Sequence, residues 1–211
     1  MKISRANRRF PDKSLAPARG RRFFWGTVDI CGAKTRTFEI PVAELAARFR
    51  DVGKFLALCR ACPNFGKMWT CPPFPADPPI LSEPGAVCEL FLTEIPMPDI
   101  PPEADCKAET ERAYGAARRE IDARLLEIEK RLPRALALFG GSCRGCPLPA
   151  CTRAEGRPCP RPQFARPSLE ALGFDVSAAA REIFEAELEW ASDSRPPAKI
   201  RIVSAALRAP L

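Results

Sequence analysis

Ten cysteines and no histidine constrain this chain of 211 residues more than any other feature. Without imidazole, the chain cannot form a Ser-His-Asp or Cys-His catalytic site, a zinc site with histidine ligands, or a haem site with an axial histidine. A metal ion must therefore be bound by cysteine thiolates or by carboxylates. Seven of the cysteines fall into two short groups, the first between residues 59 and 71 and the second between residues 143 and 159.

The second cysteine group has the spacing C-x2-C-x4-C-x7-C, with a proline after its second and fourth cysteines. Four thiolates suffice for one metal centre, and ligands from one short loop limit the entropy lost on ordering the site. Zinc sites usually combine two C-x2-C pairs from separate turns, whereas closely spaced cysteines with proline after the last are typical of iron–sulfur loops. The spacing favours a 4Fe-4S cluster, with zinc as the alternative, at Cys143, Cys146, Cys151 and Cys159.

Five arginines accompany a single glutamate between residues 143 and 166. A centre with four thiolates is usually anionic, and arginines beside it can offset that charge and raise a reduction potential. The alternative interpretation is that these arginines only belong to the surface of an arginine-rich protein.

The first cysteine group has the spacing C-x2-C-x8-C, followed by two prolines, and predicts a second metal site at Cys59, Cys62 and Cys71. Three ligands require either a fourth ligand from elsewhere in the chain or an open position for water, a carboxylate or substrate. A redox disulfide, or thiols that only pack in the core, are the alternatives. We expect Cys88 and Cys106 to be buried apolar residues rather than ligands. The candidates for a fourth cysteine ligand of the first group are the cysteines outside the two groups, Cys31, Cys88 and Cys106.

The positive charge of the chain lies in its first residues. Residues 1–22 contain eight basic side chains and one acid, which accounts for the whole net charge of +7. We interpret this segment as a flexible basic tail and residues 23–211 as a single cysteine-rich metal-binding domain. Contact with nucleic acid is expected only through the tail.

The sequence also indicates a compartment. The basic N-terminus lacks the apolar stretch of a secretory signal, and no run approaches the ~20 apolar residues that cross a bilayer. We therefore expect a cytoplasmic protein without membrane association. Thiols are kept reduced in the cytoplasm, so clustered cysteines there indicate metal or redox chemistry more than structural disulfides.

Strand and helix patterns alternate along the chain, which predicts an α/β or α+β fold with a single mixed sheet flanked by helices and two cysteine-rich metal-binding loops. The clearest helix spans residues 107–132, where Ala117, Ile121 and Leu125 lie on one face at helical spacing. The opposite face carries charged residues, among them Arg118 and Asp122, which we expect to point away from the core. The strands are predicted at residues 23–30, 35–40, 87–95, 135–139 and 199–207.

Two segments resemble a known family. The stretch CRACPNFGKMWTCPP (residues 59–73) resembles the C-x-x-C-P-N-Y-G-K-x-W-x-C-P-P signature of predicted metal-binding proteins, domain of unknown function 2284. The loop GGSCRGC, followed by CPRPQFARPSLEALGFDV, is similar to the later segment of that family, and the resemblance spans about residues 24–205. Phe65 stands where tyrosine is frequent, and the third cysteine of the second group comes two residues later than in the family. The resemblance implies that all seven grouped cysteines are metal ligands.

Three functions compete. The first is an iron–sulfur protein that transfers electrons or assists a redox enzyme through a redox partner protein, since the chain has no G-x-G-x-x-G or P-loop fingerprint for binding a nucleotide itself. The second is an enzyme that uses an open iron at the three-cysteine loop as a Lewis acid. The third is a zinc-binding interaction module with a basic tail.

Overall fold

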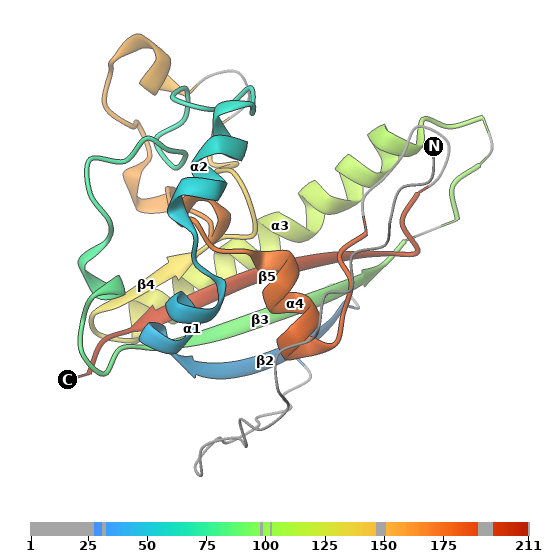
Figure 1. Ribbon diagram of the computed structural model, residues 1–211. Helices are drawn as coiled ribbons and strands as arrows, with labels where there is room; N and C mark the ends of the chain where they lie inside the picture. The colour runs from blue at the N-terminus through green and yellow to red at the C-terminus, as the bar shows by residue number, and fades with distance from the viewer. Residues whose placement is uncertain are drawn as a thin grey trace, which may run out of the picture.

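An antiparallel sheet of five strands, in the order β1-β2-β3-β5-β4, forms the centre of the molecule (Figure 1). The computed structural model describes residues 28–30, 33–97, 99–101, 103–146, 151–189 and 196–210. The predicted tail, Cys31 and the first part of the strand expected from residue 23 lie outside these ranges. The strands are β1 (Val28–Ile30), β2 (Ala33–Pro41), β3 (Val87–Pro96), β4 (Ala135–Leu138) and β5 (Lys199–Arg208).

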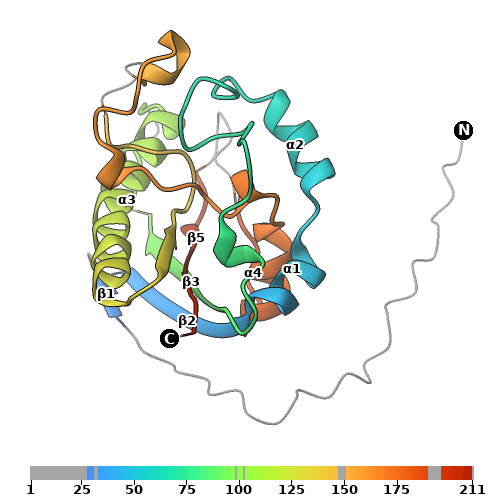
Figure 2. The ribbon, with the colours of Figure 1, turned by 90° about the vertical axis from the view of Figure 1, so that its left-hand side faces the viewer.

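Helices cover both faces of this sheet, so the fold has three layers (Figure 2). The long helix α3 packs on one face, and α1 and α4 pack on the other. No helix among the described residues is long and apolar enough to cross a membrane. The helices are α1 (Val42–Phe49), α2 (Val52–Arg60), α3 (Cys106–Arg131) and α4 (Val176–Phe184), with short 3-10 turns at Pro79–Leu81, Thr152–Glu155, Pro162–Phe164 and Glu170–Leu172.

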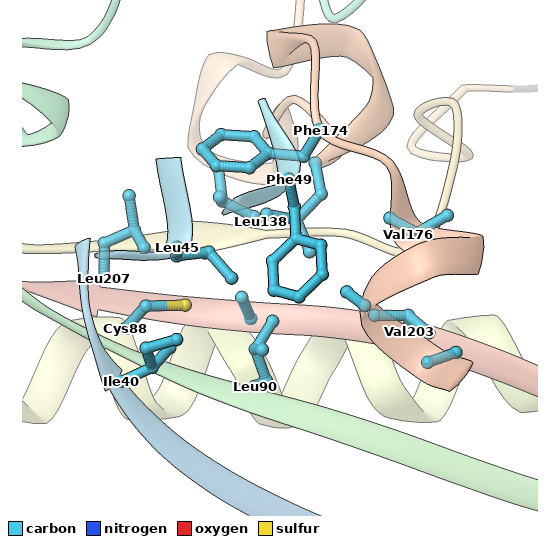
Figure 3. Close-up of a cluster of buried hydrophobic side chains, with 14 of the residues drawn as sticks. Ile40, Leu45, Phe49, Cys88, Leu90, Leu138, Phe174, Val176, Val203 and Leu207 are labelled. Carbon is cyan, nitrogen blue, oxygen red and sulfur yellow. The ribbon is translucent and has the colours of Figure 1, made fainter. Parts of the chain in front are cut away.

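Side chains alternate between two hydrophobic clusters along the central strands. In β3, Leu90 and Leu92 are buried under α1 and α4, whereas Phe91 packs against the α3 cluster. Successive side chains of a strand point to opposite faces, so a sheet covered on both sides needs apolar residues at both sets of positions. Figure 3 shows the larger cluster, in which Phe49 and Phe174 lie over the sheet.

The fold is α+β, which confirms one of the two predicted classes. The sheet was predicted to be mixed, but every ladder pair among the described strands is antiparallel. Parallel pairing occurs there only as an isolated bridge between Phe139 and Ser168. The predicted strands at residues 35–40, 87–95, 135–139 and 199–207 correspond to β2, β3, β4 and β5.

The prediction for the charged face of α3 is wrong at two positions. Arg118 is fully buried, and its guanidinium pairs with the carboxylate of Asp122 at 3.0 Å. Charged side chains are buried when they are paired and hydrogen-bonded. Here Asp122 on the same helix is the counter-ion, and the turn after β4 provides carbonyl acceptors. The apolar prediction for the same helix is confirmed, because Ala117, Ile121 and Leu125 are buried against the sheet.

Candidate metal centre

The first cysteine group begins in the last turn of α2. The carboxylate of Asp51 caps this helix by accepting a hydrogen bond from the Lys54 N–H, and Cys59 lies near the other end. After the helix, the Cys62 N–H donates to the Cys59 carbonyl at 3.0 Å, which closes a tight turn. The backbone N–H of Gly66 then donates to the Pro72 carbonyl at 3.0 Å. This bond folds the loop back, so that its third cysteine returns toward the first two.

Burial and neighbouring cysteines act on two thiols of the first group. Burial raises the pKa of the Cys59 thiol, and Cys71 and Cys62 raise it further. Burial also raises the pKa of Cys71, against hydrogen bonds from the hydroxyls of Ser142 and Thr70. Like charges disfavour ionisation, so Cys62 opposes the ionisation of both Cys59 and Cys71.

The same two effects act on Cys143 of the second group. Burial raises the pKa of Cys143, and the thiols of Cys146, Cys159 and Cys151 raise it further, against a hydrogen bond that the Gly145 N–H donates to its sulfur at 3.3 Å. Residues 147–150, between two of these cysteines, lie outside the described ranges. The second loop thus already directs one backbone donor at a cysteine sulfur.

The donor chemistry of both groups fits a thiolate-bound metal, but the thiols do not converge on one point. In the described part of the chain, no three cysteine, aspartate or glutamate side chains are close enough together to hold one metal ion. Metal binding has to draw the thiols of each group inward. The assignment of the seven cysteines as ligands therefore stays a prediction.

The two cysteine loops pack against each other at one end of the molecule, at the top of Figures 1 and 2. Arg153, from the second loop, donates hydrogen bonds to the carbonyls of Met68 (2.7 Å), Pro73 (2.6 Å) and Cys71. Its guanidinium also lies over the Trp69 ring, 5.5 Å from the ring centroid. One arginine thus binds backbone carbonyls of the first loop on both sides of its third cysteine.

Further hydrogen bonds join the two loops through other residues. The Trp69 indole N–H donates to the Arg157 carbonyl at 3.1 Å, and the hydroxyl of Thr70 accepts from the Cys143 N–H at 3.3 Å. The sulfur of Cys71 lies 3.8 Å from the hydroxyl of Ser142, the residue before the second group. The two groups, about 70 residues apart in sequence, are therefore held as one unit.

Arg118 fixes the start of the second loop, a role that the sequence analysis missed. Its guanidinium donates to the carbonyls of Gly140 at 2.9 Å and Ser142 at 3.2 Å while it pairs with Asp122. Glycine is required at 140, because a Cβ there would lie 2.3 Å from the Ile202 side chain. The available signal was the Arg-Asp pair at helical i, i+4 spacing, a weak one because such pairs are common on exposed helices.

The arginines between residues 143 and 166 contact both the second loop itself and other parts of the fold. The charge of Arg153 acts on Cys71, in the first group, and lowers the pKa of that thiol against the larger effect of burial. That these arginines offset the charge of a metal centre in the second group stays a prediction, beside the alternative that they belong only to the surface. Their main partners are Glu111 for Arg144, Glu155 for Arg157, the Gly145 carbonyl for Arg161 and Glu129 for Arg166.

Two of the cysteines outside the two groups lie in the described residues. Cys88 is fully buried in the cluster under α1, as predicted, whereas Cys106, also expected to be buried, is only half-buried as the first residue of α3. None of the nine described cysteines is in a disulfide. The fourth ligand considered for the first group is thus not provided by Cys88, whose thiol lies in the apolar core.

A family model described as "Predicted metal-binding protein (DUF2284)" matches residues 49–207, which include both cysteine groups. The match begins later than the resemblance that starts near residue 24. No curated protein matches the chain, and no solved structure matches it.

Proposed function

Because the chain belongs to the family of predicted metal-binding proteins DUF2284, we propose that it is an iron–sulfur protein with an electron-transfer or redox accessory role. In this proposal the second group, Cys143, Cys146, Cys151 and Cys159, holds a cluster of the 4Fe-4S type. The first group, Cys59, Cys62 and Cys71, holds a second metal centre. When bound, an iron–sulfur cluster supplies a one-electron redox couple.

The observation that carries the proposal is the joint anchorage of the two thiol groups. Arg153 and Trp69 tie the loops together, and the Gly145 N–H donates to the sulfur of Cys143. Hydrogen bonds to cysteine sulfur are one of the means by which a protein adjusts the potential of an iron–sulfur centre. Two thiol clusters on adjoining loops suit the passage of an electron between two centres.

Exposure of the same loops supports exchange with a partner protein. Cys62 is exposed, and Trp69 is 41% exposed beside a shallow groove that Cys159 also lines. Centres near the surface can exchange electrons with an external donor or acceptor. The absence of a nucleotide fingerprint from the sequence favours a redox partner protein over bound NAD.

The test is anaerobic purification followed by iron, acid-labile sulfide and zinc analysis with absorption and EPR spectra. We expect brown protein with iron and sulfide in near-equal amounts, and loss of that iron in Cys146→Ser. Cys106→Ser is the matched control, because Cys106 lies outside both groups, and it should keep the wild-type iron content. Colourless protein that contains zinc alone would refute the iron–sulfur proposal and support the zinc alternative.

A further inference from the structure

A cavity of about 280 Å³ adjoins the first cysteine group. Cys59 lines it from α2, Pro72 and Pro73 line it from the end of the loop, and Glu170 lines it from the 3-10 turn before α4. Most of the other lining residues are apolar. Cys59 and Glu170 thus line the same cavity from segments more than 100 residues apart.

The carboxyl of Glu170 lacks a full set of partners. Its Oε2 atom is buried and has no hydrogen-bond partner in the described structure. Burial raises the pKa of this carboxyl, against hydrogen bonds from its own N–H and the Ser168 hydroxyl and against the charge of Arg118. A buried carboxylate without a counter-ion is costly, so such a group normally binds a proton, a cation or a metal ion.

The cation that acts on Glu170 is already engaged elsewhere. Arg118 donates to both oxygens of Asp122, to the Tyr114 hydroxyl and to carbonyls of the turn after β4, including that of Gly140. Among the described residues it makes no hydrogen bond to Glu170. The free oxygen is therefore left to a proton or to a cation other than Arg118.

The backbone holds Glu170 firmly beside α2. The Asp51 N–H donates to the Gly173 carbonyl at 2.9 Å, and the Asp175 N–H donates to the Phe49 carbonyl at 2.7 Å. Gly173 has a φ of +90°, and a Cβ there would lie 2.9 Å from the Cα of Val52. The turn that carries Glu170 is therefore packed against the start of the helix that carries Cys59.

We propose that Glu170 is the fourth protein ligand of the first metal centre, so that this centre is a Cys3Glu site which opens onto the cavity. The inference rests on the proposed function, since it requires a metal at Cys59, Cys62 and Cys71. Ligation requires these side chains to close on one ion, because they stand apart in the described structure. A carboxylate beside three thiolates leaves the site accessible to an exogenous ligand from the cavity, as in catalytic metal sites.

Cobalt(II) binding to the metal-free full-length protein, under anaerobic conditions, tests the proposal through thiolate-to-cobalt charge-transfer absorption. Glu170→Gln should weaken cobalt binding at the first centre by about 100-fold or more, because loss of even an outer-shell partner costs about 10–100-fold. Glu170→Cys should restore binding and increase the charge-transfer absorption of that centre by about one third, since three thiolates become four. Asp77→Asn is the matched control, because Asp77 lines the same cavity but accepts two hydrogen bonds from Arg50 at 2.7 Å.

Two further measurements separate a ligand from a structural residue. The metal-free Glu170→Gln protein should unfold at the same or a higher temperature than the wild type, because the substitution removes a buried, incompletely paired carboxylate. Unchanged cobalt affinity in Glu170→Gln, together with loss of first-centre binding in Cys71→Ser, would overturn the inference and leave the proposed function standing. Unchanged binding in Cys71→Ser would instead refute the first metal centre itself.

Discussion

Substitution of Arg118 by methionine should destabilise the protein and loosen the second cysteine loop. The side chain is fully buried and makes two hydrogen bonds of 3.0 Å to Asp122, besides those to the carbonyls of Gly140 and Ser142. Methionine fills a similar volume but leaves the carboxylate of Asp122 buried without a counter-ion. Removal of one partner from a buried ion pair costs about 3–5 kcal/mol.

Tyr114 limits the loss of unfolding free energy in this variant. Its hydroxyl donates to the Gly140 carbonyl at 2.6 Å, so that carbonyl keeps one partner in the variant. The unpaired carboxylate of Asp122 therefore dominates the expected cost. For a chain of this size each kcal/mol lowers the melting temperature by roughly 2–4 °C, which gives a decrease of about 6–20 °C.

Urea unfolding followed by circular dichroism measures the free energy of unfolding. The metal content of the purified variant measures the effect on the second cysteine loop. Arg119→Met is the matched control, because Arg119 is the next residue of α3 and is exposed. The double variant Arg118→Met/Asp122→Leu should recover part of the loss, since it removes the orphaned charge. A loss below about 1 kcal/mol in Arg118→Met, equal to that of the control, would refute the argument.

Two other substitutions test how the cysteine loops are held. Arg153→Ala should lower the free energy of unfolding by about 1.5–3 kcal/mol, because the hydrogen bonds to the Met68 and Pro73 carbonyls are lost. It should also increase proteolytic cleavage within residues 61–73. Cleavage no faster than in Arg157→Ala would show that Arg153 does not hold the first loop. Glu129→Gln tests the anchor behind the second loop. Burial alone would raise the pKa of Glu129, but hydrogen bonds from Arg166 and the Ala137 N–H lower it. Its stabilisation is therefore present above the unfolded-chain pKa of about 4.3 and is lost as the pH falls through the folded-state pKa. Unfolding curves between pH 3 and pH 7 (roughly one unit below that value and well above it) should show a shallower acid dependence in the variant; an unchanged slope would show that the pair does not stabilise the fold.

Elements with a strong local pattern were predictable from sequence. The strand over residues 87–95 and the helix over residues 107–132 agree closely with β3 and α3, because alternation and helical spacing are properties of neighbouring residues. The pairing of the strands was harder to predict. The antiparallel order of the sheet depends on which strands meet in space, and the sequence prediction of a mixed sheet was wrong on that point.

Charged residues were interpreted less well than apolar ones. Arg118 and Asp122 follow the pattern of a solvated helix face. Their burial depends on backbone carbonyls of the turn after β4, such as that of Gly140, which lie later in the chain. Glu170 lies in the stretch ARPSLEALG that resembles the family, but its burial was not expected, since a glutamate in a short turn is ordinarily exposed. Its burial beside Cys59 follows from the packing of that turn against α2.

Local chemistry and spacing alone determined which donors this chain can offer a metal. Without imidazole, seven cysteines on two short loops make sulfur the main donor available, and residues close in sequence stay close in any compact fold. Tertiary structure decided that the two loops adjoin, that Arg118 and Arg153 hold them, and that Glu170 and Cys59 line one cavity. These relations join residues far apart in the chain, so they exist only after the sheet and helices have packed.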